Sequence, residues 1–95
     1  MIMSIAHASV DDPDAEYIFG AWSNMVVGER PEGLIDCYLS RGDKVVYMVS
    51  VWEDDAAYDR AIEDRENNPN YGFFEACGLE PTRTVYDVIG RMTGR

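Results

Sequence analysis

His7 is the only histidine in this chain, and few other side chains could carry out acid–base chemistry near neutral pH. The unperturbed pKa of imidazole lies close to neutrality, so His7 is the candidate general base and the one candidate catalytic residue. The alternative is a histidine at a strand end whose ring is satisfied by a backbone contact.

Aromatic and amide side chains supply the candidate binding surface for a flat ligand. The two indoles can stack on a planar compound, and an amide or a phenol can add a hydrogen bond. The candidates for substrate binding are Trp22, Asn24, Tyr47, Trp52, Tyr58 and Phe73. The alternative is that the aromatic rings pack in the core, where large side chains dominate the energetics.

The sequence predicts neither a metal site nor a disulfide. One histidine and the two isolated cysteines, Cys37 and Cys77, cannot assemble an ordinary zinc site. A reduced pair of buried thiols is expected, because the cytoplasm disfavours disulfides.

Composition indicates a single folded domain over residues 1–95, with its core at about 2–89 and a loose tail at 91–95. Hydrophobic residues make up 46% of the chain, and 8 basic against 18 acidic residues give a net charge of −10. That charge argues against nucleic acid and anionic membranes as partners. No apolar stretch approaches the ~20 residues of a membrane helix, and Met1–Ser4 lacks the basic start of a secretion signal. A cytoplasmic protein is expected.

Hydrophobic periodicity and turn residues divide the chain into strands and helices. The expected elements are strand 2–8, a helix beginning at 11–14 and ending near 26, strand 34–39, a turn at 41–43, strand 45–52, a helix from about 55 interrupted at 67–70, a short helix at 71–77, and strand 82–89. This order is the split βαβ arrangement of α+β, ferredoxin-like folds. Right-handed crossovers then predict an antiparallel sheet in the order fourth, first, third, second strand, with both helices on one face.

The strand at 45–52 is apolar at odd and even positions alike. Val46 and Met48 therefore fall on one face of the sheet, while Tyr47 and Val49 fall on the other. Because the helices cover a single face, the opposite face needs another partner. The sequence predicts a homodimer in which two sheets form a β-barrel-like core.

Three segments carry a resemblance to a known family: Pro31–Leu34, the hairpin, and the Val49–Asp54 junction. They resemble the antibiotic biosynthesis monooxygenase-like (ABM) domains of the dimeric α/β-barrel superfamily, over about Ile2 to Ile89. The resemblance implies a homodimer with a pocket between the helices and the sheet of each subunit. It also implies a small aromatic or polyketide-like substrate, oxygenated without a metal, flavin or other cofactor.

In an oxygenase of that kind, His7 would deprotonate a phenolic substrate. The break at 67–70 would let the second helix act as a lid over the same cleft; the alternative is that the break is a simple helix end. The alternative is a non-catalytic small-molecule-binding or dimerisation module. The haem-degrading branch of the superfamily uses an Asn on the first strand with a Trp and a His on the second helix. Here His7 is expected at the first-strand position, Ala61 at the Trp position, and no histidine follows. Haem degradation by that route is not expected.

Overall fold

A computed structural model describes residues 1–64 and 68–94, and it contains the predicted succession of strands and helices. The elements are β1 (Ile2–Ser9), α1 (Glu16–Val26), β2 (Leu34–Gly42), β3 (Val45–Trp52), α2 (Asp55–Glu63), α3 (Pro69–Ala76) and β4 (Thr82–Asp87). The short helix predicted at 71–77 is α3, separate from α2 as expected. Residue 67 of the predicted break and residue 95 of the predicted tail lie outside the described residues.

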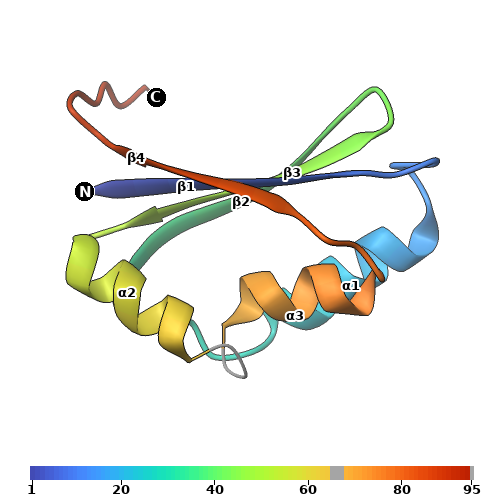
Figure 1. The fold of residues 1–95 in the computed structure, drawn as a ribbon, viewed down its shortest axis with the longest axis horizontal. Helices are drawn as coiled ribbons and strands as arrows, with labels where there is room; N and C mark the ends of the chain where they lie inside the picture. Colours follow the sequence, from blue (N-terminus) through green and yellow to red (C-terminus); the bar gives the residue numbers. More distant parts are fainter. Residues whose placement is uncertain (65–67, 95) are drawn as a thin grey trace.

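The strands form one antiparallel sheet in the order β2-β3-β1-β4, which confirms the predicted ferredoxin-like arrangement. Figure 1 shows the helices α1, α2 and α3 together on one face of this sheet. Across residues 1–64 and 68–94, none of the helices combines the length and apolar character needed to cross a bilayer.

The two faces of the sheet follow from its register. Ile2 lies opposite Trp52 and His7 lies opposite Tyr47, and directly paired residues share a face. Ile2 and Trp52 are buried and face the helices. The other face, termed the open face, includes Met3, Ile5, His7, Asp36, Tyr38, Ser40, Tyr47, Val49, Val51, Thr82, Thr84 and Tyr86.

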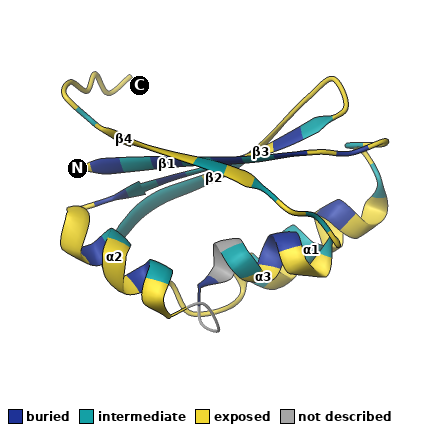
Figure 2. Ribbon diagram, in the orientation of Figure 1, coloured by how far each residue is buried: buried dark blue, intermediate teal, exposed yellow. Residues whose placement is uncertain are grey.

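The core lies between the helices and the sheet. Ile18 of α1 and Phe73 and Phe74 of α3 pack on Val46 and Met48 of β3. The two phenylalanine rings meet edge to face, with centroids 5.2 Å apart. Figure 2 shows that the buried residues of the helices lie on the sides that face the sheet. Each large side chain buried in this way contributes roughly 1.5–3 kcal/mol to stability.

The first helix begins later than predicted. The sequence placed its start at 11–14, but α1 begins at Glu16, and Ala15 occupies the N-cap without a side-chain hydrogen bond. Asp12 instead accepts a hydrogen bond from the backbone N–H of Asp14 at 3.0 Å. The prediction was wrong because an aspartate satisfies a nearby N–H equally well in a turn and at a helix start.

Two strand boundaries also differ from the prediction. The turn expected at 41–43 is displaced toward Lys44, because β2 remains paired as far as Gly42. Lys44 adopts a φ of 54°, in the left-handed region that a tight hairpin turn requires. The last strand ends at Asp87 rather than at residue 89.

A close backbone approach fixes the loop between α1 and β2. Gly33 has a φ of 87°, and a Cβ at this position would overlap the Cβ of Ala57 in α2. The carbonyl of Gly33 accepts the N–H of Glu53 at 2.9 Å. Asp54 caps α2 by accepting the N–H of Ala57 at 2.8 Å. The loop and the start of α2 are therefore locked together.

We expect Gly33→Ala to lower the free energy of unfolding by at least about 2 kcal/mol, since it combines an unfavourable φ with a steric overlap. Gly20→Ala is the matched control: a Cβ at Gly20, in α1, meets no atom within 4 Å. That change should raise helix propensity and stabilise by about 0.5–1 kcal/mol. Urea unfolding of the two variants measures both effects, and equal stabilities would contradict the close approach at Gly33.

Candidate functional site

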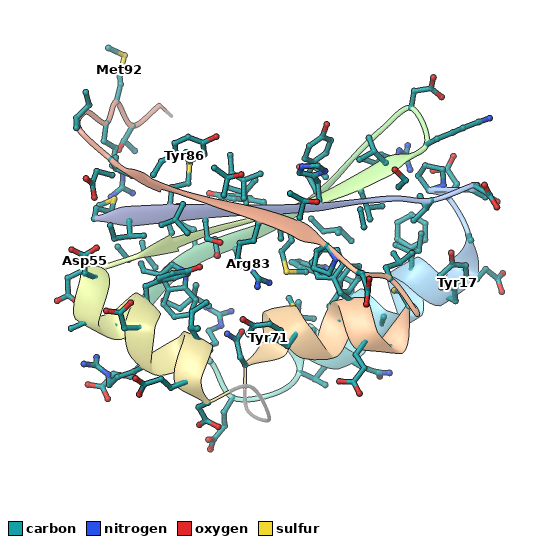
Figure 3. The ribbon with its side chains drawn as sticks, viewed as in Figure 1. Tyr17, Asp55, Tyr71, Arg83, Tyr86 and Met92 are labelled. Carbon is teal, nitrogen blue, oxygen red and sulfur yellow. The ribbon has the colours of Figure 1, made fainter. Side chains whose placement is uncertain are left out.

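Arg83 brings a positive charge to the helix-facing side of the sheet. It pairs with Ala6, a buried residue on that side, and Figure 3 shows its side chain pointing from β4 toward the helices. Among the residues that the structure describes, the guanidinium Nη2 is buried and has no hydrogen-bond partner. A buried charged donor without an acceptor is unfavourable, so an anionic group beside it would be stabilised.

Tyr71 of α3 covers this cation. The centre of its ring lies 4.6 Å from Cζ of Arg83, which is a cation–π contact. Both side chains lie in an open hollow of about 620 Å³ between α3 and β4, termed the Arg83 hollow. The hollow is lined by Tyr71, Phe74, Glu75, Leu79, Glu80, Pro81 and Arg83.

Two buried hydroxyl groups lie near Arg83 on the same face. Ser4 and Ser50 are opposite each other in β1 and β3, and each is 1% exposed. The indole N–H of Trp52 donates to Oγ of Ser50 at 3.0 Å. Ser4 is two positions along β1 from Ala6, which pairs with Arg83. Both hydroxyl groups are covered by the core, and neither lines the Arg83 hollow.

The cysteines are not suited to nucleophilic chemistry. Burial raises the pKa of Cys37 to about 11, and burial also raises the pKa of Cys77. Both thiols are therefore protonated at neutral pH, and the thiolate is the reactive form. Over the described ranges, no group of three or more His, Cys, Asp or Glu side chains is arranged to hold a metal ion.

His7 and Tyr47 lie together on the open face, with ring centres 5.7 Å apart. The helix-facing positions of β1 belong to Ser4 and Ala6 instead. His7 therefore lies on the first strand as expected, but on the face away from the helices, and its role as a general base stays a prediction. Side chains of a strand alternate between faces, so a difference of one residue moves the imidazole to the opposite side of the sheet.

The remaining candidate residues are also not brought together. Trp52 and Phe73 are each 1% exposed and belong to the core. Tyr58 meets Trp52 edge to face, with ring centres 6.1 Å apart. Asn24 is exposed on α1. These side chains do not form one surface with His7 and Tyr47.

Trp22 lines a separate cavity of about 200 Å³ at the other edge of the sheet. This cavity, termed the Trp22 pocket, lies beside α1, the following loop and the first residues of β2. Its lining is Trp22, Met25, Val26, Glu29, Arg30, Pro31, Leu34, Ile35, Asp36 and Cys37. The space beside Trp22 is open, but His7 is not on its wall.

Arg83 and Tyr71 were missed by sequence reasoning. The strand pattern around Arg83 contained a weak signal, because Arg83 and Val85 must share a face of β4. Without knowledge of the helices, that face could not be identified as the inner one. Tyr71 follows Pro69 and Asn70 in the sequence, which gave no indication that its ring meets Arg83.

Comparisons with known proteins establish the fold. No protein-family model matches the sequence, and no curated protein matches it. Among solved structures, one assigned as an antibiotic biosynthesis monooxygenase from Deinococcus radiodurans is 12% identical, with a TM-score of 0.68, covering 100% of this chain and 99% of that one. SnoaB, a cofactor-independent oxygenase from Streptomyces nogalater, is 20% identical with a TM-score of 0.62, covering 97% and 94%.

A third similar structure is MhuD with manganese protoporphyrin IX bound, which is 14% identical with a TM-score of 0.69, covering 99% of this chain and 100% of that one. The chain therefore has the fold of the antibiotic biosynthesis monooxygenase proteins along its full length. At these identities the likeness concerns the fold.

We expect Arg83→Met to stabilise the ligand-free protein, because it replaces a buried unpaired donor with an apolar side chain of similar length. The gain should be on the order of 1 kcal/mol, which corresponds to a rise in Tm of about 4–8 °C for a domain of this size. Arg60→Met, at an exposed arginine on α2, is the matched control and should leave Tm nearly unchanged. A lower Tm for Arg83→Met would mean that the guanidinium is already well satisfied.

Proposed function

We propose that this protein binds a planar aromatic or polyketide-like compound that carries an oxyanion, and oxygenates it without a cofactor. The observation that carries the proposal is the buried Nη2 of Arg83, which has no acceptor within the described residues and lies in a hollow of about 620 Å³. The bound compound would supply that acceptor.

The hollow suits an aromatic anion better than a small inorganic one. Tyr71, Phe74 and Leu79 give it apolar walls, while Arg83 supplies the donor. Glu75 and Glu80 also line it, and their carboxylates oppose a ligand of high negative charge. A flat compound with one ionised oxygen satisfies these conditions, since its ring contacts the walls and its oxygen meets the guanidinium.

The proposed chemistry begins with loss of a proton from a phenol. Arg83 lowers the pKa of the bound phenol by stabilising the phenolate, and the proton passes to solvent. The electron-rich ring carbon of the phenolate then reacts with dioxygen. One oxygen atom becomes the new ring carbonyl. The other leaves as water, with the one hydrogen of the oxidised carbon and one proton returned from solvent, and a quinone results. The likeness in fold to SnoaB supports this proposal.

A second candidate function is binding without turnover. It is favoured by one observation: the only histidine lies on the opposite face of the sheet from the Arg83 hollow. The lining of the hollow therefore includes no side chain with an ordinary pKa near neutrality to act as a base. A protein that binds the compound without converting it needs the guanidinium of Arg83 but no base.

Aerobic incubation with anthrone tests the enzymatic proposal. We expect quinone formation, followed by absorbance, to exceed the rate in buffer and to fall at least about 10²-fold in Arg83→Gln, the loss expected for one stabilising donor. His7→Ala is the matched control and should retain the rate, since it changes the far face of the sheet.

Three results distinguish the alternatives. A rate equal to that in buffer excludes oxygenation of anthrone-type phenols. Anthrone-induced stabilisation without conversion, lost in Arg83→Gln, establishes the binding function instead. A rate lost in His7→Ala and kept in Arg83→Gln would move the site away from the Arg83 hollow.

We also propose that the protein is a homodimer joined through the open face. Met3, Ile5, Val49 and Val51 lie at the centre of this face, and the described helices lie on the other side. The tyrosines around them remain accessible, with Tyr38 55% exposed. Asp36 and His7 lie beside this apolar centre. An apolar surface with polar residues around it is typical of an interface between proteins.

Val49→Lys should therefore convert the dimer to a monomer, because it places an unpaired charge in the centre of a desolvated interface. Sedimentation equilibrium at several concentrations measures the change. Asn24→Lys adds the same charge on the exposed side of α1 and should leave the dimer intact. A wild-type mass of one chain at all concentrations would exclude the proposed dimer.

A further inference from the structure

The segment after β4 leaves the sheet with large apolar side chains in solvent. Val88 is still held, since its N–H donates to the carbonyl of Met1 at 2.9 Å. Beyond it, Ile89 is 99% exposed and Met92 is 96% exposed. Figure 1 shows this segment on the side of the sheet opposite the helices, which is the side of the open face. A second copy that covers the open face would therefore contact this C-terminal segment.

The Trp22 pocket and the C-terminal segment lie at the same level of the sheet, on opposite edges. Asp87 pairs with Ile2, Ile2 pairs with Trp52, and Trp52 pairs with Leu34. This row joins the last residue of β4 to the first residue of β2. The C-terminal segment therefore begins level with the part of β2 that lines the Trp22 pocket.

Two sheets can pack face to face about a twofold axis that runs either along the strands or across them. An axis along the strands exchanges the two edges and keeps the level, so β4 of one copy lies beside β2 of the other. Each C-terminal segment then reaches the partner's Trp22 pocket. With an axis across the strands, β4 of one copy lies beside β4 of the other, and the strand ends are reversed. The C-terminal segment of one copy then meets the opposite end of the partner's β4.

We infer that the C-terminal segment of a second copy docks in the Trp22 pocket, with the partner subunit's Met92 filling it. A cavity of about 200 Å³ is similar in size to those that accept one apolar group. An unbranched methionine adapts well to an irregular space. The five residues that follow Asp87, ending at Met92, span up to roughly 16 Å when extended, enough to pass the edge of β2.

Charge at the rim of the Trp22 pocket agrees with this occupant. Glu29 and Asp36 line the pocket along with a single cation, Arg30. The segment brings Arg91 next to Met92. Two copies of a chain with a net charge of −10 repel each other, so a cation of one placed against carboxylates of the other favours this arrangement.

A cysteine already in the pocket provides the test. In Met92→Cys, the new thiol should form a disulfide with the partner's Cys37 when the full-length protein is treated with copper phenanthroline at about pH 9. At that pH the exposed new thiol is largely ionised, which offsets the low reactivity of the buried Cys37. We expect a covalent dimer on a non-reducing gel, lost when Cys37→Ala is added and kept when Cys77→Ala is added. Asn24→Cys, on the exposed side of α1, is the control for random collision and should give little cross-linking.

Sedimentation of the same samples separates this inference from the dimer on which it rests. A dimer without cross-linking through Cys37 overturns the docking of the segment and leaves the dimer in place. A disulfide within one chain, visible as a monomer of altered mobility, also overturns it. A monomer at all concentrations overturns both. In support, Met92→Ser should weaken the dimer at least 10-fold, whereas Thr93→Ser should not.

Discussion

The structure depends on a sheet whose central strand β3 is apolar on both sides. Burial of Val46 and Met48 against Ile18 and the two phenylalanines fixes the helices on one face. The same alternation places Val49 on the other face, away from the helices. The described helices cover only one face of the sheet. The fold therefore has an interior between the helices and the sheet, and an apolar surface on the other face that stays accessible in the monomer.

One charged side chain enters the interior between the helices and the sheet at the β4 edge. Most of the helix-facing surface is filled by aromatic and aliphatic side chains, but Arg83 reaches it from the edge strand. Its contact with the ring of Tyr71 is favourable and leaves Nη2 without an acceptor within the described chain. An unsatisfied buried donor weakens the ligand-free protein and strengthens binding of an anion. The proposed binding of an anionic compound follows from this unsatisfied donor.

The two faces then take separate roles in our proposals. The interior binds a ligand through Arg83, whereas the open face and the C-terminal segment hold a second copy. His7 and Tyr47 both lie on the open face, so our proposals place them at the interface between the two copies. The Trp22 pocket lies at the edge between these regions, where a segment from a partner can reach it.

The sequence alone determined the order of elements, the strand order and the two-faced character of β3, because these follow from local periodicity and from the handedness of crossovers. It also predicted a short helix separate from α2, although α3 begins at Pro69 and not at residue 71. It did not determine which face of β1 the helices cover, and the structure places His7 on the open face. Only the tertiary structure placed Arg83 beneath Tyr71 without a hydrogen-bond acceptor for Nη2. Whether a charge is paired depends on residues distant in sequence, and no local pattern records that.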